Sequence, residues 1–287
     1  SSIVADDGTR LFAHSKDGAF SKDATRAILC DGIFCDGYIW RYLWDDLAKE
    51  MPVTHWHYRG HGRSSAPVDA QRISVGAHAS DLQAVRRSLG DPPVVLVGHS
   101  MGCQVALEAY RRYPENVRAI VLLCGSFGRI TSTFHGVPIL DLILPKLIAL
   151  VHKAPHIARA LWSRVPVEAA LKLAFKSGEI DSERVNPDDL RPYMTHMTHV
   201  DLPLFLRMLR EAGDHSAWDY LPDVKVPTLI VAGERDTFTP ASLARAMASA
   251  IPGSELLMLE RGTHVAPIEQ SELIDDAVVS FLKRALA

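Results

Sequence analysis

The chain has 287 residues, of which 47% are hydrophobic and 23% charged, the composition of an ordinary globular protein. A chain of this length can bury a core that needs no disulfide or metal for stability. The net charge of −3 does not suit a surface that binds polyanions, so we expect no nucleic-acid partner.

Eight short apolar runs have the character of β-strands, and helical patterns separate most of them. The first two runs flank Asp7-Gly8 and predict a hairpin. The predicted strands are 2–5, 9–14, 26–30, 53–58, 94–97, 119–123, 228–231 and 256–259. The predicted helices are 40–49, 75–89, 101–113, 243–250 and 273–286. This alternation predicts an α/β fold with a mostly parallel eight-stranded sheet and flanking helices.

The alternation stops after the sixth strand and resumes near Val226. The intervening stretch is rich in Pro, Leu and His and has no convincing strand. We therefore expect a core formed by residues 1–126 and 221–287, with residues 127–220 as an inserted helical cap.

One segment of the predicted cap, 137–151, is apolar on nearly all sides of a helix. It is too short and too interrupted for a membrane span, which needs about 20 apolar residues. Such a helix is expected to be buried or to face an apolar ligand. Two interpretations stay open: packing between cap and core, or a hydrophobic acyl site with loose association with a membrane or lipid.

The segment 94–102 reads V-V-L-V-G-H-S-M-G, a buried strand that enters a turn before a helix. This is the G-x-S-x-G nucleophile elbow in the context that supports it. Gly98 and Gly102 leave room for a sharp turn, which lifts the Ser100 hydroxyl above the sheet. The turn also aims the first amides of the following helix at the place where an oxyanion forms.

A serine nucleophile needs a base, and the base needs an acid that orients it. Asp236 follows the predicted strand 228–231, and His264 follows 256–259, so both reach the sheet edge that carries Ser100. The order Ser, Asp, His is the order expected for this elbow. Glu234 is less suitably spaced from its strand.

These motifs resemble the α/β-hydrolase superfamily, in particular its capped lipase- and esterase-like members. Residues 57–64 are similar to the family's R-G-x-G-x-S loop. Residues 31–33, with Trp40 downstream, are similar to its oxyanion loop, and 233–236 and 262–264 to its acid and base loops. The resemblance implies an oxyanion hole made by the backbone N–H groups of Ile33 and Met101.

The sequence departs from the family at Asp31, where a histidine is usual. Two interpretations stay open. Asp31 could repel a substrate carboxylate and raise the pKa of a nearby histidine. Alternatively, it could hydrogen-bond loop amides.

The predicted function is hydrolysis of a small-molecule carboxylic ester with a medium-chain or otherwise lipophilic acyl group, through an acyl-enzyme, without metal or organic cofactor. Carbon–carbon bond hydrolysis and acyl transfer on the same triad stay open, as does a non-catalytic binding protein. Four cysteines without a CxxC pair, and no recognisable signal peptide, predict a cytoplasmic protein. An upstream segment and a homodimer are left open.

Overall fold

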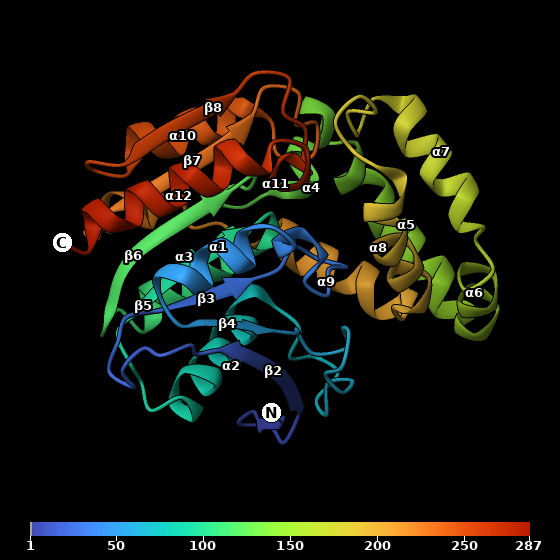
Figure 1. The fold of residues 1–287 in the computed structure, drawn as a ribbon. Helices are drawn as coiled ribbons and strands as arrows, with labels where there is room; N and C mark the ends of the chain where they lie inside the picture. Colours follow the sequence, from blue (N-terminus) through green and yellow to red (C-terminus); the bar gives the residue numbers. More distant parts are fainter. Residues whose placement is uncertain (1) are drawn as a thin grey trace.

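The structure, a computed structural model, describes residues 2–287 and is centred on one eight-stranded sheet (Figure 1). The strand order is β1-β2-β4-β3-β5-β6-β7-β8. The β1–β2 and β2–β4 pairings are antiparallel, and the other pairings are parallel. The strands are β1 (Ser2–Val4), β2 (Arg10–Lys16), β3 (Arg26–Cys30), β4 (Val53–Trp56), β5 (Val94–His99), β6 (Val117–Leu123), β7 (Thr228–Gly233) and β8 (Glu255–Leu259). The predicted fold class is confirmed.

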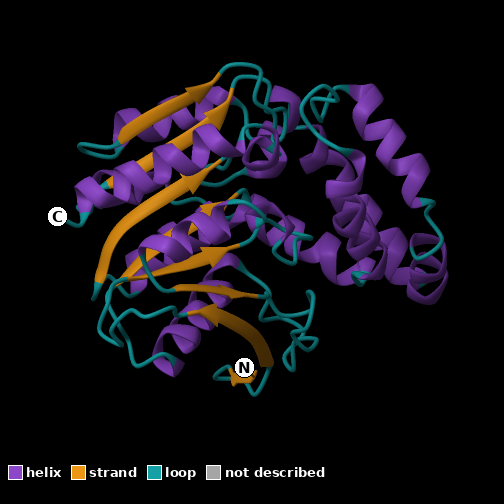
Figure 2. Ribbon diagram, viewed as in Figure 1, coloured by secondary structure: helices purple, strands orange, loops and turns teal. Residues whose placement is uncertain are grey.

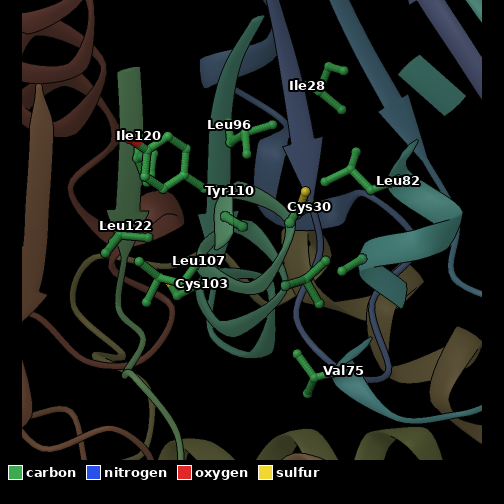
Figure 3. Packing of buried hydrophobic residues seen from close by; sticks show 14 of the residues in the cluster. Ile28, Cys30, Val75, Leu82, Leu96, Cys103, Leu107, Tyr110, Ile120 and Leu122 are labelled. Atoms are coloured by element: carbon green, nitrogen blue, oxygen red, sulfur yellow. The ribbon is translucent and has the colours of Figure 1, made fainter. Parts of the chain in front are cut away.

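Both faces of the central strands are buried, because successive side chains of a strand point to opposite sides. In β5, Val94 and Leu96 belong to one apolar cluster, whereas Val95 and Val97 belong to another. Figure 3 shows part of the first cluster, with Leu96 and Ile28 on neighbouring strands. Burial on both faces explains why these strands read as continuous apolar runs in the sequence.

Helices of the core cover the two faces of the sheet (Figure 2). One face carries α2 (Val75–Ser88), α3 (Met101–Arg112) and α10 (Ala241–Ala250), and the other carries α1 (Leu43–Glu50) and α12 (Ser271–Ala285). The helix expected from residue 40 begins only at Leu43, because the 3-10 turn η1 (Tyr38–Trp40) precedes it.

The chain between β6 and β7 is helical and lies beside the carboxyl ends of the parallel strands (Figure 1). Its elements are α4 (Ile130–Thr133), η2 (Phe134–Gly136), α5 (Ile139–Lys153), α6 (Pro155–Trp162), α7 (Val167–Ser177), α8 (Pro187–His199), α9 (Leu202–Asp214) and η3 (Trp218–Asp223). We call residues 127–220 the cap, as the sequence predicts it.

The two ends of the cap meet at one point. Gly128 forms an antiparallel bridge with Ser216. The Ala217 N–H donates to the Phe127 carbonyl at 2.7 Å. The cap therefore leaves the core and rejoins it at neighbouring positions, next to the end of β6.

Helix α5, within the apolar 137–151 segment, is covered by protein on one side only. Leu144 and Val151 are 4% and 7% exposed and pack against Leu206 of α9. Leu142 and Leu150, in contrast, are 69% and 66% exposed. Packing against α9 therefore explains the buried side of α5, and the two interpretations of its other apolar side stay open. Over residues 2–287, no helix combines the length and hydropathy that a bilayer crossing requires.

Candidate active site

Ser100 lies at the sharp turn between β5 and α3. Its φ of 54° and ψ of −121° fall outside the regions that a serine normally adopts. A Cβ added to Gly98 would lie 2.7 Å from the Cys103 nitrogen, and one added to Gly102 would lie 2.7 Å from the Asp31 carbonyl oxygen. Only glycine fits at these two positions, so the backbone approaches closely enough to hold Ser100 in this strained conformation.

The structure brings together the three residues that the sequence analysis singled out. His264 Nε2 lies 2.9 Å from Ser100 Oγ. On the other side of the ring, His264 Nδ1 lies 2.9 Å from Asp236 Oδ2 and 3.1 Å from Oδ1. The three side chains follow β5, β7 and β8, whose carboxyl ends meet at one edge of the sheet. The Ser100 hydroxyl can therefore donate to His264 Nε2, while the Nδ1–H of the same ring donates to the Asp236 carboxylate.

The Asp236 carboxylate is held in place by its own loop. Oδ1 accepts the N–H groups of Phe238 at 2.9 Å and Thr239 at 2.8 Å, and Oδ2 accepts the Thr239 hydroxyl at 2.8 Å. Asp236 is only 4% exposed, so these bonds replace the solvation that burial removes. Glu234, the competing acid, is exposed.

His99, the residue before Ser100, hydrogen-bonds the backbone of the loop that carries His264. Its Nε2–H donates to the His264 carbonyl oxygen at 2.9 Å. Burial, together with the neighbouring His264, lowers the pKa of His99 to about 3. A neutral His99 thus orients the backbone of His264 without adding a charge. The sequence signal for this residue is only its place between Gly98 and Ser100.

The loop that carries Ile33 lies against the elbow. A Cβ added to the preceding Gly32 would be 3.1 Å from Ser100 Cβ. The next amide, Phe34 N–H, donates to Nε2 of buried His61 at 3.2 Å. Within residues 2–287, the hydrogen bonds of this loop leave the Ile33 N–H without a protein acceptor. Met101 is the first residue of α3, where N–H groups have no partner inside the helix.

Asp31 neither faces solvent nor bonds loop amides, in contrast to two of the expectations for this position. Its charge does act to raise the pKa of His57 and His61, as expected, against the larger lowering effect of burial. Its carboxylate is 1% exposed and bonds side chains rather than loop amides, namely Trp40 Nε1 at 2.6 Å and His55 Nε2 at 2.8 Å. Burial alone would raise the pKa of Asp31, but the interactions with His55 and Trp40 outweigh it and hold the pKa below its ordinary value. Asp31 therefore braces the start of the loop instead of facing a substrate.

Residues 28–271 match the family model described as the alpha/beta hydrolase fold. The chain belongs to the α/β-hydrolase family. An esterase from Exiguobacterium antarcticum superposes on this α/β hydrolase with a TM-score of 0.78 over 99% of both chains, at 23% identity.

Two curated relatives of the α/β hydrolase have names that point to different reactions. A 2-hydroxy-6-oxononadienedioate/2-hydroxy-6-oxononatrienedioate hydrolase of Klebsiella pneumoniae is 28% identical, over an alignment that spans 84% of this chain and 83% of the relative. A pimeloyl-[acyl-carrier protein] methyl ester esterase of Neisseria meningitidis serogroup C is 27% identical, over an alignment that spans 81% of this chain and 85% of the relative.

Aromatic side chains from core and cap gather around the triad of the hydrolase. The Phe238 ring stacks on His264 with centroids 4.9 Å apart, and Phe134 of the cap contacts Phe238 at 5.0 Å. Phe34, in the loop of Ile33, stacks on two cap residues, Phe205 and Trp162. Aromatic rings thus form part of the junction of cap and core.

Glu269, the last residue of α11 (Ala266–Glu269), connects the His264 loop with the cap. Its carboxylate accepts the N–H and the hydroxyl of Thr263 at 2.9 and 2.6 Å. It also accepts the N–H of Asp181 in the cap at 2.8 Å. The local sequence does not reveal this link, because Asp181 lies 88 positions away.

Proposed function

We propose that this α/β hydrolase cleaves carboxylic esters through an acyl-enzyme formed on Ser100. The observation that supports the proposal most strongly is the continuous chain of hydrogen bonds from Ser100 Oγ through the His264 ring to Asp236, with 2.9 Å on each side of the ring. This arrangement is a nucleophile, a general base and an orienting acid in the geometry that acyl transfer needs.

The reaction follows from the same contacts. His264 Nε2 takes the Ser100 proton as Oγ attacks the ester carbonyl. The resulting oxyanion accepts hydrogen bonds from the backbone N–H groups of Ile33 and Met101. His264 then protonates the leaving alcohol, and a water activated by the same ring hydrolyses the acyl-enzyme. Asp236 stabilises the imidazolium formed in each step.

The surroundings of the triad favour a lipophilic and uncharged substrate. The Phe238 ring, stacked on His264, and Phe134, which contacts Phe238, supply apolar surface beside the triad. Phe34 follows Ile33 in the loop next to the elbow. Burying apolar surface contributes about 25 cal/mol per Å², so a medium-chain acyl group would gain affinity here.

The ionisable groups at the junction of cap and core also favour an uncharged substrate. Asp36 pairs with His196 of α8 at 3.4 Å. Glu179 pairs with His135 at 2.9 Å, beside the acid loop. Each pair joins a carboxylate to a histidine, so neither offers an excess of positive charge to a substrate carboxylate.

Carbon–carbon bond hydrolysis on the same triad is the second candidate, because the Klebsiella pneumoniae relative carries the name of a hydrolase of an oxo-dienedioate. That name denotes a dicarboxylate. The paired acids at Asp36 and Glu179 do not suit a dianion.

A labelling experiment followed by a substrate comparison tests the proposal. A fluorophosphonate should modify the protein once, on the peptide that contains Ser100. The labelled protein should lose hydrolysis of nitrophenyl butanoate and hexanoate. Labelling together with turnover of vinylogous diketones, but not of esters, would replace the first candidate by the second. Absence of labelling would contradict both.

A further inference from the structure

The outer side of the cap carries an apolar surface that the proposed reaction does not use. Leu142 and Leu150 of α5 are 69% and 66% exposed, and Ile157 and Leu161 of α6 are 63% and 66% exposed. We call these four residues, together with Lys146 and Lys153, the docking face. Exposed aliphatic side chains that adjoin in this way are unusual on a protein without a partner.

The spacing of these residues places them on shared helix faces. Leu142, Lys146 and Leu150 are four residues apart in α5, so they lie above one another on the side opposite to the buried Leu144. Ile157 and Leu161 are likewise four apart in α6.

A groove joins the two helices. It has a volume of about 450 Å³, and every lining side chain is apolar, including Leu150, Ile157, Leu161 and Trp162. The docking face is therefore continuous from α5 to α6, at the end of the cap that lies far from the sheet (Figure 1).

The charge of this region differs in sign from that of the chain. Residues 139–165 contain four lysines and arginines but one acidic residue, Asp141, whereas the whole chain carries −3. Lys146, Lys153 and Arg164 are exposed, and none has a carboxylate within 4.0 Å in the described part of the chain. Apolar side chains are thus bordered by unpaired cations.

We propose that the docking face binds the surface of an anionic lipid bilayer. Aliphatic side chains can enter the boundary between headgroups and acyl chains, while the lysines contact lipid phosphates. A second copy of the chain fits less well. A twofold dimer through this face would bring Lys146 and Lys153 close to the same lysines of the other copy.

One residue of the groove connects the docking face with the loop of the candidate active site. Trp162 lines the groove and stacks on Phe34 with ring centroids 5.9 Å apart, and Phe34 follows Ile33 in the chain. Bilayer binding would bring the cap–core junction near lipid, which suits lipophilic esters. The idea that the bilayer supplies ester substrates rests on the proposed function. The binding of the docking face to a bilayer does not.

Vesicle co-sedimentation tests the proposal on the full chain. The probes are vesicles of phosphatidylcholine alone and of phosphatidylcholine with phosphatidylglycerol. We expect binding to the mixed vesicles, weakened by high salt because the charge interaction is screened. Leu150→Ser/Leu161→Ser should weaken partitioning at least about tenfold. Lys146→Gln/Lys153→Gln should weaken it by on the order of tenfold.

Matched substitutions outside the docking face control for non-specific effects. Leu273→Ser, at a leucine of α12 that is 51% exposed, and Lys225→Gln, at another exposed lysine, should bind as the unchanged protein does. Ser100→Ala should also bind normally, which separates this proposal from the catalytic one. Circular dichroism and thermal melts check folding.

Three results would overturn the proposal. The first is no binding to mixed vesicles. The second is equal binding by all variants. The third is a dimer in sedimentation velocity that Leu150→Ser/Leu161→Ser abolishes, since a second copy would then be the occupant.

Discussion

Asp236 is fixed more firmly than the other two candidate residues. Its two oxygens accept hydrogen bonds from the amides of Phe238 and Thr239, from the Thr239 hydroxyl and from the His264 ring. An acid held in this way selects one tautomer of the histidine, with the proton on Nδ1 and the lone pair of Nε2 directed at Ser100.

Replacing Asp236 by asparagine should therefore lower kcat by about 10⁴-fold, because the amide stabilises neither that tautomer nor the imidazolium. The measurement is hydrolysis of nitrophenyl butanoate, with Glu234→Gln as the control that should keep its activity. If Asp236→Asn kept most of its activity, the acid would have to be another group, such as Glu234.

At the scale of elements, the structure couples the histidine loop to the cap through Glu269. Three donors share its carboxylate, two from Thr263 and one from Asp181. A glutamine at this position has one oxygen and an NH₂ group that cannot accept, so at least one donor loses its partner.

We expect Glu269→Gln to reduce kcat by about tenfold to a hundredfold, since small displacements of a catalytic group carry such costs. KM should change less. Glu272→Gln on α12, at an exposed glutamate nearby, is the control. A Glu269→Gln enzyme with unchanged kcat and an unchanged pH profile would show that the link is structural only.

The aromatic contacts between cap and core predict a preference among acyl chains. Phe205 of α9 stacks on Phe34 beside the loop of Ile33. Catalytic efficiency on nitrophenyl esters should rise from acetyl to longer chains, by about 0.8 kcal/mol for each methylene that becomes buried. Phe205→Ala should reduce the octanoyl-to-acetyl ratio. An efficiency that peaks at acetyl and is negligible at octanoyl would contradict the acyl site.

For the whole molecule, buried neutral histidines make stability depend on pH. Burial lowers the pKa of four of them below the ordinary value, to about 3 for His57 and His99, to about 4 for His61, and well below the ordinary value for His78. Between these values and about 6.5, the unfolded chain binds protons at these sites that the folded chain does not. The stability they contribute is present above pH 6.5 and is lost as the pH falls.

Asp275 opposes this effect, because burial and Asp46 raise its pKa to about 7, so the folded chain holds a proton there that the unfolded chain releases. Asp36 and Asp81, whose pKa values burial also raises, act in the same direction as Asp275. His14 and His196, whose pKa values burial lowers, act with the four histidines. Six histidines thus outnumber three carboxyl groups. The free energy of unfolding should fall between pH 6.5 and 5, by about 1.4 kcal/mol per pH unit for each unbalanced proton. Denaturant melts across this range measure it. A constant or increasing stability toward pH 5 would contradict this account.

The sheet, its flanking helices and the positions of the three candidate residues could be predicted from the sequence, because each rests on a local pattern. The elbow around Ser100 is contiguous, and Asp236 and His264 each follow a buried strand. The contacts of His99 and Glu269 could not be predicted, because they join segments 165 and 88 positions apart.

The hydrogen-bond partners of Asp31 and the exposure of one side of α5 could not be predicted either, because both depend on how distant segments pack. Asp31 bonds Trp40 and His55, and only the placement of η1 and β4 beside β3 brings them together. For α5, hydrophobic periodicity predicts an apolar surface but not what covers it.

The central claim is that Ser100 attacks the substrate, and its most direct test is the kcat/KM of Ser100→Ala on a nitrophenyl ester, beside a thermal melt of the same protein. Because the members of a triad act as a unit, we predict a loss on the order of 10⁴-fold or more with an unchanged melting temperature. Near-normal turnover by folded Ser100→Ala would contradict the mechanism.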